Sequence, residues 1–432
     1  MSTRISKYLA KREKYGATHY KGNNKVVFEK GKGIYLMDVD GKIYIDAAAG
    51  YSSVNLGHNH PKICEAGRKL YEVDKDGWGP ACVVPNSFLT VAQANFLEYS
   101  CVFLDADKAL ATNGGVEGVE TALKLMLKWG YTKKKKPIPE DKAIILMFEG
   151  NFHGRTTTVI SGSSEAKYKK HFGPYAGNIL TIPYGDIGAL DAVLKKKGRH
   201  VAGIVIEPIQ GEGGVKIPPK GYLAECYALC KKHDVLFCAD EIQTGLGRTG
   251  ALLACSHENV DPDIFVLAKS LGAGKNAVAA VFAKDEFMCF EPGEHGSTYG
   301  GNTAAMTLAQ TVLEIIKDEK LCENSKKLGG YLIEKIASQI ATPELRGYWK
   351  DIRGRGLMIG IELGDGIDSE NVIDVLLDHG VMTKDAHGVI RITPPLIITK
   401  KECGELARRI GCAFRALTNA KKMCGCKDKK CC

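Results

Sequence analysis

Residues 235–245 read VLFCADEIQTG, and residues 263–269, a little further along the chain, read DIFVLAK. Each is an apolar run of strand length that delivers a charged residue, Asp240 in the first and Lys269 in the second. Continuous apolar runs predict strands that are buried on both faces, as in a parallel sheet. Because ligands bind at the carboxyl ends of parallel strands, we expect Asp240 and Lys269 to lie in a site.

The two residue types together indicate a particular chemistry. A lysine amine that is shielded from water forms an imine with a carbonyl compound. A carboxylate near it can keep a pyridinium nitrogen protonated. Asp240 and Lys269 therefore indicate a cofactor held as a Schiff base. The alternative, for either residue taken alone, is a surface charge at the end of a strand.

From Ala109 onward the sequence alternates strand, glycine-rich turn and helix. Strands are predicted at 143–148, 201–206 and 277–283, and helices at 116–129, 221–233 and 303–317. This alternation predicts an α/β domain on a mostly parallel sheet. Apolar runs at 353–361 and 389–392 predict strands of a smaller α+β domain. Two alternating runs around Asp40-Gly41 predict a hairpin near the N-terminus.

The chain is too long, at 432 residues, for one small core. We expect four parts. An N-terminal segment (1–60) packs with the small domain, and a large domain (61–300) binds the cofactor. A small C-terminal domain (301–420) and a tail rich in lysine and cysteine (421–432) follow.

The formal net charge of +9 does not by itself indicate a nucleic-acid partner. Much of it lies in Lys133–Lys136 and in residues 421–432, which hold five lysines and one aspartate. No aromatic residues alternate with these charges and no nucleic-acid motif accompanies them, which favours solvated surface charge. No apolar stretch is long enough to span a bilayer. We therefore expect neither a nucleic-acid nor a membrane partner.

The fifteen cysteines fall into two groups. Eleven lie singly in expected helices and strands, and without a signal peptide they indicate reduced thiols in a cytoplasmic protein. The other four lie in the tail, CGCKDKKCC at 424–432. This tail could bind a soft metal, and its terminal Cys-Cys after lysines also resembles a prenylation signal. We favour a redox-sensitive tail and expect no metal site, because four thiols without histidine fit no standard zinc spacing.

The longer motifs resemble one known family. DEIQTGLGRTG at 240–250, with Lys269 29 positions after Asp240, resembles the signature of the class III pyridoxal-phosphate aminotransferases. NFHGR (151–155), EPIQGEGG (207–214) and GEHGSTYGGN (293–302) extend the likeness, which runs from about Tyr15 to about Ala416. The resemblance implies the fold type I of pyridoxal-phosphate-dependent transferases. Within the family, YGA (15–17), YSSVN (51–55) and RITPPL (391–396) are most similar to ornithine aminotransferases.

The resemblance also implies roles around the cofactor. Lys269 would bond to it and later move the substrate proton, and Asp240 would pair with the ring nitrogen. The other implied contacts are Gln243 to the ring oxygen, Phe152 stacked on the ring, and the N–H groups of Gly115 and Val116 on the phosphate. In the family, Ser297 and Thr298 complete the phosphate site of the partner subunit, which implies a homodimer with the active site at its interface.

Roles toward the substrates are implied in the same way. Arg155 would grip the α-carboxylate, and Tyr15 and Tyr51 would orient ornithine. Glu212 would neutralise Arg391 while ornithine reacts and release it for 2-oxoglutarate afterwards. The alternatives are a surface arginine at 155, a packing tyrosine at 15 and an ordinary ion pair between 212 and 391.

The sequence departs from the ornithine pattern in several places. Gly114 and His153 stand where other residues are usual, and DGWGPACVVP at 76–85 does not match the corresponding ornithine segment. The expected function is an ornithine δ-aminotransferase, with acetylornithine or 4-aminobutyrate aminotransferase as the alternative. Two other classes are a binding protein acting through the basic tail and a Rossmann dehydrogenase. The latter is disfavoured because no G-x-G-x-x-G follows the first strand of a βαβ unit.

Overall fold

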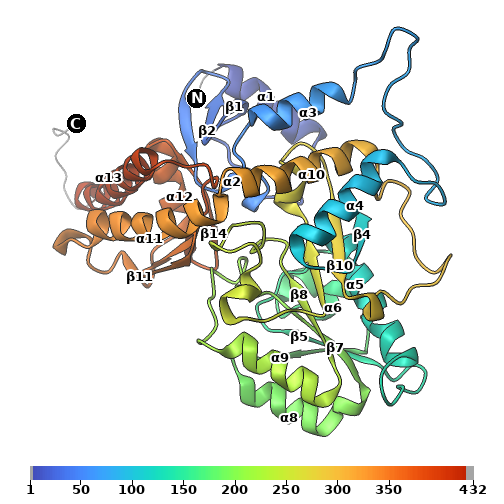
Figure 1. Ribbon diagram of the computed structural model, residues 1–432. Helices are drawn as coiled ribbons and strands as arrows, with labels where there is room; N and C mark the ends of the chain where they lie inside the picture. The colour runs from blue at the N-terminus through green and yellow to red at the C-terminus, as the bar shows by residue number, and fades with distance from the viewer. Residues whose placement is uncertain (1–2, 425–432) are drawn as a thin grey trace.

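The computed structural model describes residues 3–424, so the tail beyond Cys424, with its metal-binding and prenylation alternatives, lies outside the described residues. A seven-stranded sheet with the order β4-β10-β9-β8-β7-β5-β6 forms the centre of the large domain (Figure 1). Its strands are β4 (Lys108–Thr112), β5 (Ile144–Phe148), β6 (Ile179–Ile182), β7 (Val201–Ile206), β8 (Leu236–Asp240), β9 (Ile264–Leu267) and β10 (Ala279–Ala283).

The sheet is mostly parallel, as the sequence predicts. β9, β8, β7, β5 and β6 run parallel as neighbours, whereas β10 is antiparallel to both β9 and β4. Every residue of β7, β8, β9 and β10 is buried. Strands covered on both faces have no polar face, which is why they read as unbroken apolar runs.

Helices cover both faces of this sheet. Cys238 and Val266 pack into the cluster that contains α5 (Gly115–Thr132), whereas their neighbours Phe237 and Phe265 pack into the cluster of α8 (Ile187–Lys197) and α9 (Tyr222–His233). This alternation follows from the two-residue period of a strand. The other helices before residue 320 are α1 (Thr3–Tyr15), α2 (Ala49–Ser52), α3 (Pro61–Lys69), α4 (Val91–Leu104), α6 (Thr157–Ser161), α7 (Ala166–Lys169) and α10 (Thr303–Asp318), with short 3-10 turns η1 (Gly198–His200), η2 (Ala254–Glu258), η3 (Lys269–Gly272) and η4 (Asp285–Phe287).

Two four-stranded sheets lie at the other end of the molecule (Figure 1). One joins β1 (Phe28–Lys32), β2 (Tyr35–Asp38) and β3 (Ile43–Asp46) to β13 (Val381–Met382). The other joins β11 (Trp349–Arg355), β12 (Met358–Leu363), β15 (Val389–Ile392) and β14 (Lys384–Ala386). Helices α11 (Leu321–Ile340), α12 (Ser369–Asp378) and α13 (Lys400–Cys424) pack beside them, and η5 (Pro343–Leu345) precedes β11. The parallel pairing of β3 with β13 ties the N-terminal segment to the C-terminal part of the chain.

Two local features differ from the sequence-based expectation. The run at 353–361 is a hairpin, because Gly356 has a φ of 56° and reverses the chain between β11 and β12. Helix α1 was not expected, since Ile5 is its one buried residue and leaves no apolar stripe to detect. Among residues 3–424, none of the helices is both long and apolar enough to cross a bilayer.

Candidate active site

A cavity of about 670 Å³ opens where the carboxyl ends of β8 and β9 meet the start of α5. The register pairs Asp240 with Val266, three residues before Lys269, so both charged groups lie at one edge of the sheet. The cavity lining includes much of the expected cofactor and substrate set: Gly115, Val116, Phe152, Arg155, Asp240, Gln243 and Lys269. The apolar runs therefore deliver these side chains to one place, as the sequence predicts.

Asp240 is buried and held by two hydrogen bonds. His153 Nδ1 lies 2.6 Å from its Oδ2, and the Ile242 backbone N–H donates to its Oδ1 at 3.1 Å. Burial acts to lower the pKa of His153, but the hydrogen bond and charge of Asp240 outweigh it, so the pKa of this imidazole is raised. The carboxylate is thus fixed in direction before any ligand binds.

Burial shifts the pKa values of Lys269 and Glu207 in opposite directions. Burial lowers the pKa of the Lys269 amine, although Glu212 and Asp240 oppose it. Burial also raises the pKa of Glu207 to about 8, with His153 opposing and Asp240 adding to the rise. The cavity base therefore holds an amine that loses its proton more readily than in water and a carboxyl that keeps its proton at neutral pH. Lys269 also has a φ of 45°, an uncommon backbone conformation for lysine.

The N-terminus of α5 forms one wall. The Glu117 side chain accepts from the N–H of Asn113 at 2.8 Å, and α5 begins two residues later at Gly115. The first N–H groups of a helix have no partner within it and attract anions. A Cβ at Gly154 would lie 2.4 Å from Val116 Cγ2, so the turn carrying Arg155 passes too close to α5 for any other residue.

These groups fit pyridoxal phosphate. The amine of Lys269 suits its aldehyde, and the buried Asp240 suits its ring nitrogen. Phe152 supplies an aromatic ring to the cavity lining, and the start of α5 at Gly115 suits the cofactor's phosphate. Gln243 is a buried residue of the cavity lining, and its Oε1 would lie 1.8 Å from a Cβ at Gly211.

The substrate-side residues form two groups. The Arg155 guanidinium lies over the Phe152 ring, 5.3 Å from its centroid. Arg391, on β15, is buried and forms an ion pair with Glu212. The Arg391 guanidinium also lies 5.1 Å from the centroid of the Tyr51 ring, and burial raises the pKa of that tyrosine. Tyr51, Glu212 and Arg391 are thus one contiguous unit.

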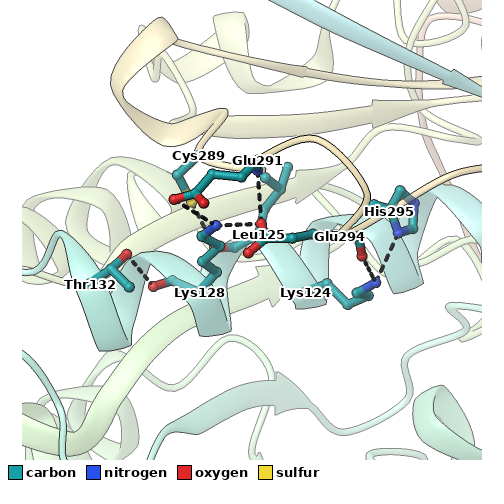
Figure 2. A network of polar contacts seen from close by, with 8 residues as sticks. All are labelled: Lys124, Leu125, Lys128, Thr132, Cys289, Glu291, Glu294 and His295. Atoms are coloured by element: carbon teal, nitrogen blue, oxygen red, sulfur yellow. Dashed lines mark hydrogen bonds and ion pairs between the residues drawn. The ribbon is translucent and has the colours of Figure 1, made fainter. Parts of the chain in front are cut away.

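Ser297 and Thr298 lie in the loop between β10 and α10 and do not line this cavity. Figure 2 shows how α5 holds that loop: Lys124 Nζ contacts the Glu294 carbonyl at 2.9 Å and His295 Nδ1 at 3.1 Å. Lys128 pairs with Glu294 one turn further along. The loop is therefore fixed to α5, and Ser297 and Thr298 are not in the cavity lining.

Of the five expected substrate residues, Arg155 lines the cavity, whereas Tyr51, Glu212, Arg391 and Tyr15 are not in its lining. Tyr15 is the last residue of α1 and is 77% exposed, with Lys14 Nζ 5.0 Å from its ring centroid. Two residues given no role from sequence, His153 and Glu207, are in the cavity lining. Glu207 could have been found by the argument used for Asp240, since it follows the buried strand β7 directly.

Comparisons with known proteins agree with this geometry. The family model for class III aminotransferases matches residues 17–414. The ornithine aminotransferase of Halalkalibacterium halodurans is 41% identical over 404 residues, covering 93% of this chain and 96% of the relative. The ornithine aminotransferase of Plasmodium yoelii yoelii is 42% identical over 403 residues, covering 92% and 93%.

Solved structures give the same result. The ornithine aminotransferase of Toxoplasma gondii superimposes with a TM-score of 0.91 at 36% identity, covering 97% of each chain. The acetylornithine aminotransferase of Elizabethkingia anophelis gives 0.85 at 39% identity, covering 96% of this chain and all of the other, 100%. With its sheet, its cavity and these relatives in agreement, the chain belongs to the class III, pyridoxal-phosphate-dependent aminotransferases.

Proposed function

We propose that the protein is an ornithine δ-aminotransferase. It converts L-ornithine and 2-oxoglutarate to L-glutamate 5-semialdehyde and L-glutamate, and the semialdehyde cyclises to pyrroline-5-carboxylate. The observation that carries the proposal is the Glu212–Arg391 pair under the Tyr51 ring. Glu212 would neutralise Arg391 while the δ-amine of ornithine reacts. Arg391 would then be free to bind the α-carboxylate of 2-oxoglutarate in the second half of the reaction. The relatives that bear the name ornithine aminotransferase support it.

Bound pyridoxal phosphate supplies an electron sink for the carbon that loses its proton. Lys269 would hold the cofactor and then take the proton from the δ-carbon of ornithine through its Nζ, a role that a lowered amine pKa favours. Asp240, oriented by His153, would keep the ring nitrogen protonated. The charge that develops on the ring is thereby stabilised by a group that is already in position.

The remaining contacts would orient the two ligands. Gln243 would donate to the ring oxygen, Phe152 would cover the ring face, and the N–H groups of Gly115 and Val116 would bind the phosphate. Arg155 would bind the α-carboxylate of ornithine as a bidentate pair. We give Tyr15 no role, since it lies exposed outside the cavity.

We also propose a homodimer whose subunits complete each other's phosphate sites through Ser297 and Thr298. The segment between α3 and α4 supports this, because it extends away from the body in Figure 1. It carries Trp78 and Phe88, which are 77% and 67% exposed. Exposed apolar surface of this kind marks an interface. Phe88→Glu should give monomers in light scattering, whereas Ile43→Glu, at an exposed apolar residue of strand β3, should not.

The domain limits and location follow as further proposals. Helix α10 packs along α3, α4 and η3, so we place the start of the small domain at α11 rather than at residue 301. The N-terminal 60 residues would pack with the small domain through β3 and β13. A cytoplasmic location is supported by the eleven free thiols from Cys64 to Cys412.

Acetylornithine aminotransferase is the second candidate, because an enzyme of that name is among the similar structures and residues 76–85 depart from the ornithine pattern. Purified protein with 2-oxoglutarate should form glutamate and a pyrroline from ornithine. The product of acetylornithine cannot close this ring, because its α-nitrogen is acylated. Glutamate formed from acetylornithine or 4-aminobutyrate but not from ornithine would overturn the proposal.

A further inference from the structure

Arg155 rests on two aromatic rings, and one of them, Tyr168, lies outside the site motifs. Its guanidinium carbon lies 3.7 Å from the centroid of the Tyr168 ring, closer than to the Phe152 ring at 5.3 Å. The two rings meet edge to face, 5.9 Å apart at 79°. Tyr168 lies on α7 and is not itself part of the cavity lining. Its contact with the site therefore runs through Arg155 and Phe152.

The turn that carries Arg155 and the segment that carries Tyr168 are fixed to one another. The side-chain amide of Asn151 donates to the Gly162 carbonyl at 2.8 Å, and the Gly150 N–H donates to Ser164 Oγ at 2.8 Å. Tyr168 lies shortly after Ser164 in the chain, on helix α7, and Glu165 caps the N-terminus of that helix. The tyrosine ring is thus held in a set place relative to the arginine.

The geometry of the contact leaves the arginine able to bind. A guanidinium stacks through its flat face, while its N–H groups point outward in the same plane. In the described residues 3–424, Arg155 has no hydrogen bond or ion pair to hold those N–H groups. A ring beneath the face can therefore fix the side chain of an exposed arginine without competing for the edge that a carboxylate needs.

We propose that Tyr168 is a positioning residue that holds Arg155 for the α-carboxylate of the amino donor. The inference rests on the proposed function, because it takes Arg155 as the carboxylate ligand. It predicts that Tyr168 sets the preference for donors with a free α-carboxylate over the corresponding diamines. The ring is the active part, so phenylalanine should serve in its place.

The test compares ornithine with 1,4-diaminobutane, which is ornithine without its carboxylate. Tyr168→Leu should raise KM for ornithine about three- to thirty-fold, the range of a cation–π contact, with little change in kcat. It should leave kcat/KM for 1,4-diaminobutane within about two-fold of wild type, and Tyr168→Phe should behave as wild type. Added to Arg155→Met, Tyr168→Leu should cost nothing further.

Three results would overturn the proposal: an equal loss on both donors, failure of phenylalanine to restore KM, or additive losses in the double variant. These differ from a failure of the proposed function, in which wild-type enzyme does not use ornithine. In that event acetylornithine and N-acetyl-1,4-diaminobutane make the same comparison, and the same ratios decide the role of Tyr168.

Discussion

A substitution at Gly211 can displace the Gln243 side chain while position 243 itself stays glutamine. A Cβ at position 211 would lie 1.8 Å from Gln243 Oε1 and 2.6 Å from its Cδ, far inside contact distance. Alanine at this position therefore displaces the Gln243 amide. If that amide donates to the cofactor ring oxygen, the loss is one hydrogen bond, or ~0.5–1.5 kcal/mol. Gly211→Ala should then weaken cofactor binding about two- to thirteen-fold.

The assay is a titration of cofactor-free protein with pyridoxal phosphate, followed by absorbance, in four variants. Gln243→Ala should weaken binding by a similar factor, and Gly211→Ala added to it should cost little more, because the clashing atoms are gone. Gly404→Ala is the control, since a Cβ there meets nothing within 4 Å. Equal affinity of Gly211→Ala and wild type, with both folded, would refute the assigned role of Gln243.

Glu212→Ala should leave the charge of Arg391 without its partner. The single-turnover rate with ornithine should then fall about tenfold or more relative to the rate with glutamate. An unchanged ratio of the two rates would contradict the proposed exchange of Arg391 between Glu212 and substrate. The carboxyl of Glu207 has a pKa near 8 in place of 4.5, so it costs stability as the pH rises between those values. The gain in unfolding free energy from Glu207→Gln should therefore grow from pH 5 to pH 8. A gain that stays constant over this pH range would contradict the raised pKa of Glu207. The pKa of His153 is raised by Asp240 despite burial, so its stabilisation is full below pH ~6.5 and is lost as the pH rises through the folded value. His153→Phe should accordingly cost more stability at pH 6 than at pH 9, and a larger cost at pH 9 would contradict it.

The sequence predicts the core of this fold because buried strands leave a plain pattern. β7 matches the predicted limits of 201–206 in full, and β8 and β9 begin and end within one residue of their apolar runs. Asp240 and Lys269 could be placed in one site because parallel strands present their carboxyl ends at the same edge. The same reasoning, applied to β7, would have pointed to Glu207.

Other contacts could not be predicted, because they depend on distances between segments. The approach of His153 to Asp240 joins residues 87 positions apart, and the stacking of Arg155 on Tyr168 depends on the path of a short helix. The hairpin within 353–361 was missed because Gly356 interrupts an apolar run that otherwise reads as one strand. The exposed place of Tyr15 reflects helix α1, whose polar sequence gives no apolar periodicity.

Two of the departures from the ornithine pattern, Gly114 and His153, lie in the cavity itself, and the third lies elsewhere. They share that cavity with the residues that match the family motifs, among them Lys269, Asp240 and Gln243. The segment at 76–85 lies instead in the exposed stretch that we assign to the subunit interface. Donor preference is therefore best tested on the proposed dimer, in which residues from both subunits would surround the substrate.

The central claim is that the amine of Lys269 carries the cofactor. Protein loaded with pyridoxal phosphate, reduced with borohydride and digested, should yield one peptide bearing the pyridoxyl group, with the label on Lys269. The label should be absent from Lys269→Arg treated in the same way. A label found on another lysine, or none on wild-type protein saturated with the cofactor, would contradict the account.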